Sequence, residues 1–145
     1  MSMDVMYSSR TDQWSTPQSF FDELDTEFGF TLDPCATDQN HKCKRYFTKQ
    51  DDGLSQIWGD HIVYCNPPYG RAIKRWVQKC YDEVFNGNVP CAVMLIPART
   101  DTEWFHNYIY HHAEIRFIKG RLRFGDATDN APFPSMVVVF RKDTK

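Results

Sequence analysis

The alternation of apolar and polar residues along the chain predicts helices and strands in turn. Apolar residues recur at helical spacing between positions 20 and 28, after a start signal in which Ser15 or Thr16 is the N-cap and Pro17 the first helical residue. Gly29 ends this pattern. Residues 72–85 have the same spacing. A further helix is expected after Asp101 or Thr102, either of which can serve as its N-cap. The predicted helices cover residues 17–28, 72–85 and 103–111.

Short runs of β-branched and aromatic residues separate these helices. The run CAVMLI at 91–96 is apolar without a break, which is typical of a central parallel strand buried on both faces. Because helices alternate with strands, the pattern predicts an α/β fold with a mostly parallel sheet. The expected strands are 30–32, 46–48, 62–65, 91–96, 115–118 and 136–140.

Length and composition narrow the class of protein. The 145 residues suit a single domain over 1–145, with residues 1–12 flexible. A content of 41% hydrophobic and 25% charged residues is ordinary for a soluble globular protein. The chain has no apolar run of membrane-spanning length and no signal-peptide pattern, so we expect a cytoplasmic protein without a membrane partner.

Charge and cysteine usage exclude further classes. The net charge of −2 does not fit a bulk nucleic-acid coat, so any DNA binding has to come from local patches. The five cysteines form no C-x-x-C pair, which argues against a disulfide framework. His41 and Cys43 lie close together, but two ligands are too few to predict a metal site.

The most constrained segment is IVYCNPPYG at 62–70, where a strand runs into Asn66, Pro67, Pro68 and Tyr69. Two prolines in succession fix the backbone and remove two N–H groups. An Asn side-chain oxygen and a bare backbone carbonyl can then accept both hydrogens of one planar amino group. The ring of Tyr69 offers a face on which a heterocycle can stack.

This arrangement suits methyl transfer to an amino nitrogen. The nitrogen is a poor nucleophile because its lone pair is delocalised into the ring. Two fixed acceptors localise that pair and stabilise the positive charge that develops during attack. The plainer alternative is a proline-rich turn between a strand and a helix, with Tyr69 as a surface aromatic.

Polar residues follow several predicted strands. Asp33 and Asn66 each come directly after a strand, and residues 97–102 follow another. In parallel sheets, ligands bind beyond the carboxyl ends of the strands, where the strand order switches. The sequence therefore predicts a pocket at this edge.

Several motifs together resemble one family. They are Trp14-x-Thr16-Pro17, the segments 32–36 (LDPCA), 46–48 (YFT), 51–54 (DDGL), 66–70 (NPPYG), 96–101 (IPARTD) and 120–124 (GRLRF). With these motifs in this order, the chain resembles the compact DNA N6-adenine methyltransferases of phages and prophages, which use S-adenosylmethionine. The resemblance implies a compact Rossmann-like class I methyltransferase sheet with an antiparallel edge, in a bacterial or phage-infected host cell.

The chain departs from larger members of that superfamily in its first half. They carry a glycine-rich loop after the first strand, whereas no glycine follows Ala36 here until Gly53. Only about 25 residues separate Ala36 from Ile62. This length is enough for one crossover connection but not for two extra strands and helices. We therefore expect a sheet that is trimmed in its first half.

The resemblance also implies residue roles. S-adenosylmethionine would lie beside Asp33 and Pro34, and a flipped adenine would lie at the catalytic residues Asn66, Pro67, Pro68 and Tyr69. A plainer interpretation of Asp33 is that it forms a turn. Asp51 and Asp52 can likewise be interpreted as part of a solvated turn. The expected donor-binding residues are Trp14, Thr16, Pro17, Asp33, Pro34, Asp51 and Asp52, with no metal ligands.

DNA contacts require cations, because adenine inside a duplex must be flipped out to be methylated. Arg71 and Lys74 begin the helix after the NPPY segment, and Arg99 follows the next strand. Lys119, Arg121 and Arg123 alternate around Leu122 and would line one face if this segment were a strand. A solvated basic edge is the alternative interpretation.

The favoured function is adenine-N6 methylation of DNA at specific sites, as in restriction-modification. Two alternatives stay open, because other planar amino groups suit the same motif: methylation of cytosine N4, or of a protein glutamine. A third is a non-catalytic DNA-binding relative, suggested by the missing glycine loop.

Overall fold

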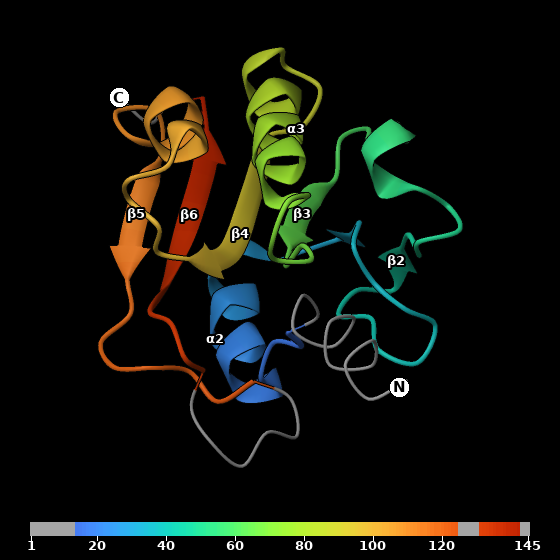
Figure 1. Cartoon of the computed structure of the whole chain (residues 1–145). Coiled ribbons are helices and arrows are strands. Elements are labelled where there is room, and N and C mark those ends of the chain that lie inside the picture. The colour runs from blue at the N-terminus through green and yellow to red at the C-terminus, as the bar shows by residue number, and fades with distance from the viewer. Residues whose placement is uncertain (1–13, 125–130, 143–145) are drawn as a thin grey trace, which may run out of the picture.

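The computed structural model describes residues 14–124 and 131–142 and arranges six strands in one sheet (Figure 1). The sheet order is β2-β1-β3-β4-β6-β5. The predicted flexibility of residues 1–12 lies outside the described residues. The strands are β1 (Leu32–Asp33), β2 (Arg45–Tyr46), β3 (Ile62–Cys65), β4 (Cys91–Pro97), β5 (Glu114–Phe117) and β6 (Ser135–Arg141).

Four neighbouring strands, β2, β1, β3 and β4, run parallel, and β6 is antiparallel to both β4 and β5. This confirms the predicted α/β class and the mostly parallel sheet. The antiparallel strand β6 lies next to the edge strand β5. From β1 the chain crosses to β2 on one side and then to β3 on the other. The strand order therefore switches between β1 and β3, which is where an open α/β sheet binds its ligands.

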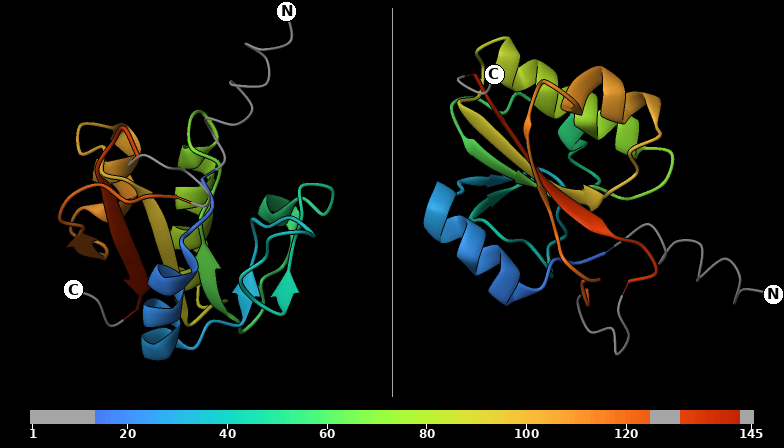
Figure 2. Two further views of the ribbon diagram at one scale, coloured as in Figure 1. Left: turned by 90° about the horizontal axis from the view of Figure 1, so that it is seen from below. Right: turned by 90° about the vertical axis from the view of Figure 1, so that its left-hand side faces the viewer.

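Helices cover both faces of the sheet (Figure 2). On one face lies α2 (Gln18–Phe28), whose Phe21 ring packs edge-on against Tyr64 of β3 at 5.1 Å between centroids. On the other face lie α3 (Ile73–Phe85) and the short π-helix η2 (Phe105–Ile109), and α3 contacts β4 and β6. Every residue of β4 is buried, as the unbroken apolar run predicted.

The first half of the sheet is trimmed, as the sequence indicated. Residues 34–44 connect β1 to β2 without a helix, and only the 3-10 turn η1 (Gly53–Ser55) lies between β2 and β3. Trp58 is fully buried, and its indole N–H donates to the Gly53 carbonyl at 2.9 Å, which ties η1 to the core. No helix in the described residues has the length and apolar content that a membrane span requires.

Two predictions about helix starts had different outcomes. The Ser15 or Thr16 N-cap is wrong: Pro17 occupies the cap position of α2 without a side-chain bond, and its extended ψ of 135° delays the first turn to Gln18. The expected cap at Thr102 is confirmed, since its hydroxyl accepts the Phe105 N–H at 3.3 Å. The helix expected at 103–111 is shorter and includes the π-helical turn η2.

Candidate active site

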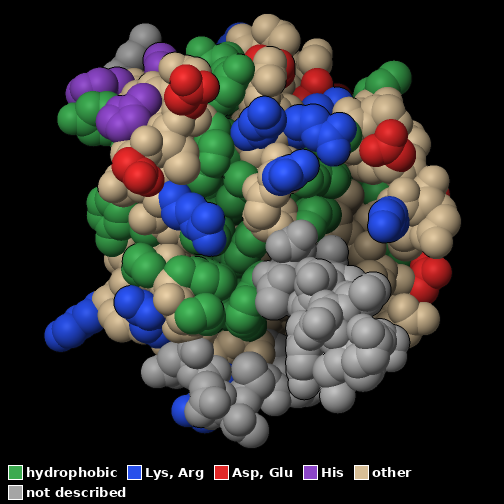
Figure 3. Space-filling view, in the orientation of Figure 1, with side chains coloured by type: hydrophobic (Ala, Val, Ile, Leu, Met, Phe, Trp, Pro, Cys, Tyr) green, Lys and Arg blue, Asp and Glu red, His purple; other side chains and the backbone are tan. Residues whose placement is uncertain are grey.

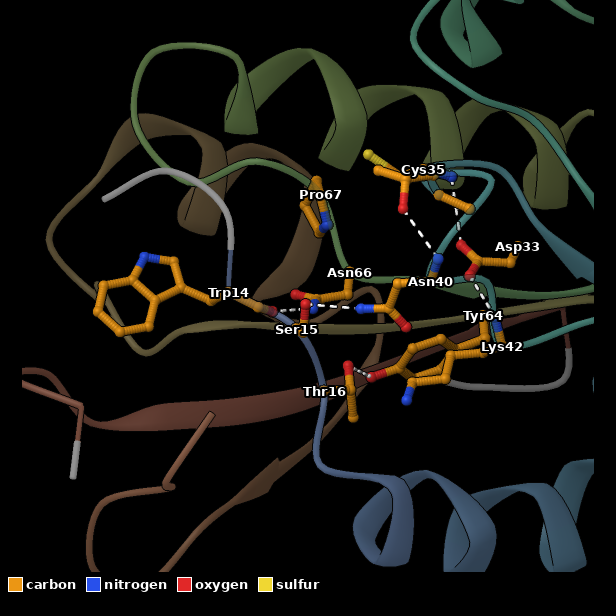
Figure 4. Close-up of a pocket in the computed structure, with 12 residues that line it drawn as sticks. Trp14, Ser15, Thr16, Asp33, Cys35, Asn40, Lys42, Tyr64, Asn66 and Pro67 are labelled. Atoms are coloured by element: carbon orange, nitrogen blue, oxygen red, sulfur yellow. Dashed lines mark hydrogen bonds between the residues drawn. The ribbon is translucent and has the colours of Figure 1, made fainter. Parts of the chain in front are cut away.

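A cavity of about 310 Å³ lies at the carboxyl ends of β1 and β3 (Figure 4). Three segments form its wall: the chain before α2, the end of β1 with the loop after it, and the end of β3. Convergence at the strand switch is what the sequence predicted for Asp33 and Asn66. The lining residues are Trp14, Ser15, Thr16, Asp33, Cys35, Ala36, Thr37, Asn40, Lys42, Tyr64, Asn66 and Pro67.

Asn66 directly follows β3 and its amide is fixed at both ends. The side-chain nitrogen donates to the backbone carbonyl of Trp14. The side-chain oxygen accepts the Tyr69 hydroxyl at 2.8 Å. An amide oxygen has two lone pairs, so Asn66 Oδ1 can accept one further hydrogen.

The two prolines lie differently with respect to the cavity. Pro67 is buried and lines it, whereas Pro68 is half-buried and is not part of the wall. No hydrogen bond among the described residues uses the Pro67 carbonyl. This carbonyl and Asn66 Oδ1 are thus two adjacent acceptors with capacity left, which is what a planar amino group requires.

Tyr69 is only 3% exposed and does not line the cavity. Its ring lies nearly perpendicular to those of Phe124 and Phe133, with centroids 6.3 and 5.6 Å away. Both phenylalanines also pack against Trp14, which lines the cavity, so the three rings and Tyr69 form an aromatic cluster beside it. Phe133 was not anticipated from the sequence, because it lies in an irregular segment before β6.

Asp33 is buried, with 5% of its surface exposed, and it also organises the loop after β1. Its carboxylate accepts the backbone N–H of Lys42 at 2.9 Å and that of Cys35 at 3.3 Å. Burial raises the pKa of Asp33, and these two N–H groups oppose the rise. The carboxylate therefore holds residues 34–44 in place while it faces the cavity.

Only some of the other residues predicted to bind the methyl donor line the cavity. Trp14 and Thr16 line the cavity, and the Thr16 hydroxyl lies 2.6 Å from that of Tyr64. Asp51 is exposed, and its carboxylate accepts the N–H and hydroxyl of Thr48 at 2.8 and 3.1 Å. The predicted residues outside the cavity wall are Pro17, Pro34, Asp51 and Asp52.

Sequence reasoning missed several polar residues of the wall, among them Ser15, Thr37, Asn40 and Lys42. The Asn40 amide donates to the Ser15 hydroxyl at 2.7 Å, so the loop after β1 is joined to the segment before α2. The polar stretch 37–44 was the available signal, but it has no periodicity from which side-chain directions follow.

Comparison with known proteins places the chain in a family. The sequence profile described as DNA N-6-adenine-methyltransferase (Dam) matches residues 5–145. The chain belongs to the Dam family. This confirms the family expected from the sequence, and membership implies a methyl donor.

Two phage proteins are similar to this Dam-family chain. The DNA N-6-adenine-methyltransferase of Escherichia phage T1 is 32% identical over 113 residues, which cover 77% of this chain and 46% of the phage protein. The DNA N-6-adenine-methyltransferase of Haemophilus phage HP1 is 29% identical over 140 residues, 91% of this chain and 80% of the phage protein. The chain thus spans about half the length of the T1 relative and most of the HP1 relative.

Cations of this Dam-family chain surround a hollow next to the NPPY segment. The hollow, about 340 Å³ in volume, lies between the start of α3 and the end of β4, with Arg71 and Arg99 in its wall. Lys74 and Arg75 line an adjoining depression. Figure 3 shows several Lys and Arg side chains gathered on the face of the molecule where Figure 1 places α3. None of these four residues belongs to an ion pair within 14–124 and 131–142.

The second basic segment, residues 119–124, is not a strand. Its Lys119, Arg121 and Arg123 are exposed. The Ala131 N–H donates to the Leu122 carbonyl at 2.7 Å, so this backbone pairs locally and not with the sheet. The segment still follows β5, which runs in the same direction as β4, and it therefore starts at the edge that carries the cavity.

Metal-binding residues were not expected, and the histidine near Cys43 has other contacts. The His41 ring stacks on Tyr46 at 3.9 Å, and its Nδ1 lies 2.8 Å from the Cys43 carbonyl. Across the described ranges no three His, Cys, Asp or Glu side chains are grouped to hold an ion.

Proposed function

We propose that this chain transfers a methyl group from S-adenosylmethionine to the N6 amino group of adenine in DNA, and that residues 1–145 form one methyltransferase domain. The main observation is the position of Asn66: its amide is fixed, has acceptor capacity left, and lines a cavity at the switch between β1 and β3. Membership of the Dam family supports the same activity.

The residues of the cavity fit the donor. S-adenosylmethionine carries an electrophilic methyl on a sulfonium, together with an amino-acid end and an adenosine end. The buried Asp33 carboxylate favours a cationic ligand, and Trp14 and Thr16 line the same cavity. Pro17 and Pro34 stiffen the backbone at these walls. Asp51 and Asp52 are assigned to the ribose or adenine of the donor.

Asn66 and Pro67 act on the acceptor. Asn66 Oδ1 and the Pro67 carbonyl each accept one hydrogen of the adenine amino group, which stabilises the positive charge that develops on nitrogen. The Tyr69 hydroxyl has one proton and two acceptors within reach, Asn66 Oδ1 at 2.8 Å and the Leu95 carbonyl at 2.9 Å. It can therefore turn to Leu95 when the amino group arrives at Asn66.

Base stacking requires the aromatic cluster to rearrange. In the proposed complex, adenine stacks on Tyr69 and Pro68 shapes the backbone at the site. Because Phe124 and Phe133 pack against the Tyr69 ring, the base has to displace at least one of them. Phe124 ends the basic segment 119–124, so DNA contacts there are well placed to move it.

The test of function is transfer of labelled methyl from S-adenosylmethionine to unmethylated DNA, followed by digestion to nucleosides. We expect the label in N6-methyladenine. Label in N4-methylcytosine would replace this proposal with the cytosine alternative. Label in added protein but not in DNA would favour the glutamine alternative, and binding of DNA without any transfer would indicate a non-catalytic relative.

We further propose that Arg71, Lys74 and Arg99 contact the DNA backbone, together with Lys119, Arg121 and Arg123. The absence of ion-pair partners around the hollow supports this assignment for the first three, because such cations are available for phosphates. Backbone contacts position the duplex and do not by themselves read the sequence.

Loss of a phosphate contact has a measurable signature. For Arg71→Ala and for Arg99→Ala, we expect the slope of log K against log salt for duplex DNA to become shallower by about 0.9. Fluorescence anisotropy over a salt series measures this slope. Lys49→Ala, which removes an exposed cation that lines neither the hollow nor the adjoining depression, is the matched control and should leave the slope unchanged. Equal slopes for all four proteins would rule out the phosphate contacts.

A further inference from the structure

Lys42 is the cationic residue in the wall of the cavity among the described residues. It is half-buried, and its ammonium donates to the Gln18 side-chain oxygen at 2.9 Å. No carboxylate within the described part of the chain forms an ion pair with it. A cation partly removed from water, with only a neutral acceptor, is a favourable partner for an anionic ligand group.

The backbone of Lys42 is anchored at the cavity. Its N–H is held by the Asp33 carboxylate at 2.9 Å, which fixes where the side chain starts. Figure 4 shows Lys42 beside Tyr64, on the side of the cavity toward Thr16. Burial lowers the pKa of Lys42, whereas the charges of Asp33 and Asp22 raise it. The wall of the cavity thus contains both a carboxylate, Asp33, and an ammonium, Lys42.

This pair of charges matches one end of the donor. The amino-acid end of S-adenosylmethionine has an α-carboxylate and an α-ammonium, and it is joined by a short carbon chain to the sulfonium whose methyl must face Asn66. The adenosine end has no anion. Asn40 and Ser15, which line the same cavity, add neutral donors suited to a carboxylate.

We propose that Lys42 binds the α-carboxylate of the methyl donor and makes the site specific for ligands that carry this group. The inference rests on the proposed function, because it takes S-adenosylmethionine as the donor. It adds a binding residue, Lys42, which the motif resemblance did not contain. Gln18 then acts as the neutral partner that holds the ammonium when no donor is bound.

The test compares two ligands and four proteins by calorimetry. The ligands are S-adenosylhomocysteine and its analogue without the carboxylate. The wild-type chain is expected to bind the analogue about 10- to 100-fold more weakly. Lys42→Met is expected to bind S-adenosylhomocysteine about 10- to 100-fold more weakly and to discriminate less than about threefold between the ligands. Lys44→Met, an exposed lysine two residues away, should behave as wild type.

The outcomes separate this inference from the proposed function. If the wild-type chain discriminates and Lys42→Met discriminates equally well, the role of Lys42 is overturned and the methyltransferase proposal stands. If the wild-type chain binds neither ligand nor S-adenosylmethionine, both fail. Lys42→Arg keeps the charge, and recovery of discrimination in this variant supports the carboxylate contact over a merely structural role.

Discussion

Asn66→Ala is expected to lower kcat for methyl transfer to DNA by about 100- to 1,000-fold, the usual cost of removing one preorganised hydrogen-bond partner of a developing charge. The substitution removes Oδ1, one of the two acceptors at the amino group, and leaves the Pro67 carbonyl alone. It also frees the Trp14 carbonyl and the Tyr69 hydroxyl from Asn66. The Tyr69 hydroxyl keeps Leu95 as a partner, so we expect the fold to persist.

Single-turnover transfer of labelled methyl measures this loss, and calorimetry with S-adenosylhomocysteine shows whether the donor cavity is intact. Asn86→Ala is the matched control, because Asn86 is an exposed asparagine at the end of α3, away from the cavity. A transfer rate for Asn66→Ala within threefold of wild type would refute the assignment of Asn66 to the acceptor amino group.

Gly53→Ala is expected to destabilise the protein by about 3 kcal/mol or more, at the upper end of overpacking effects. A Cβ at this position would lie 2.2 Å from the Pro34 carbonyl oxygen and 3.0 Å from the Trp76 ring. The first neighbour is backbone and cannot rotate away. Because Pro34 follows Asp33, the shift needed to relieve the clash would also move the wall of the cavity that Asp33 lines.

Urea unfolding measures the loss of stability, and the affinity for S-adenosylhomocysteine should fall with it. Gly29→Ala is the control, since Gly29 has a left-handed φ of 70° but nothing within 4 Å of the added Cβ. This variant should lose only about 1 kcal/mol, from backbone strain, and keep donor affinity. Equal losses in the two variants would show that the close approach of Gly53 to Pro34 does not constrain the fold.

Much of the fold follows from local sequence pattern. The strand at 62–65 was predicted with its observed bounds, and the apolar run at 91–96 is the fully buried β4. These elements are recognisable because burial on both faces of a strand leaves an unbroken apolar run, whereas burial of one helix face leaves a periodic pattern. The 30–32 prediction was less accurate, since β1 is Leu32–Asp33, a strand too short for any period to show.

The active-site prediction was strongest where residues follow strands. Asp33 and Asn66 were placed at the same edge because parallel strands end together, and both line the cavity. Residues 119–124, which would have lined one face as a strand, form none, because alternation of charged and apolar residues also occurs in an irregular segment whose apolar members pack on the core. Leu122 and Phe124 do so here.

The sequence by itself determined the α/β class, the order of the main elements, and an NPPY segment at the end of a strand. Only the tertiary structure decided that Tyr69 is buried beneath Phe124 and Phe133, and that Lys42 lies in the cavity wall. The reason is that these arrangements depend on contacts between loops distant in sequence. Trp14 with Asn66 is one example, and neither loop has a periodicity that reveals its partner.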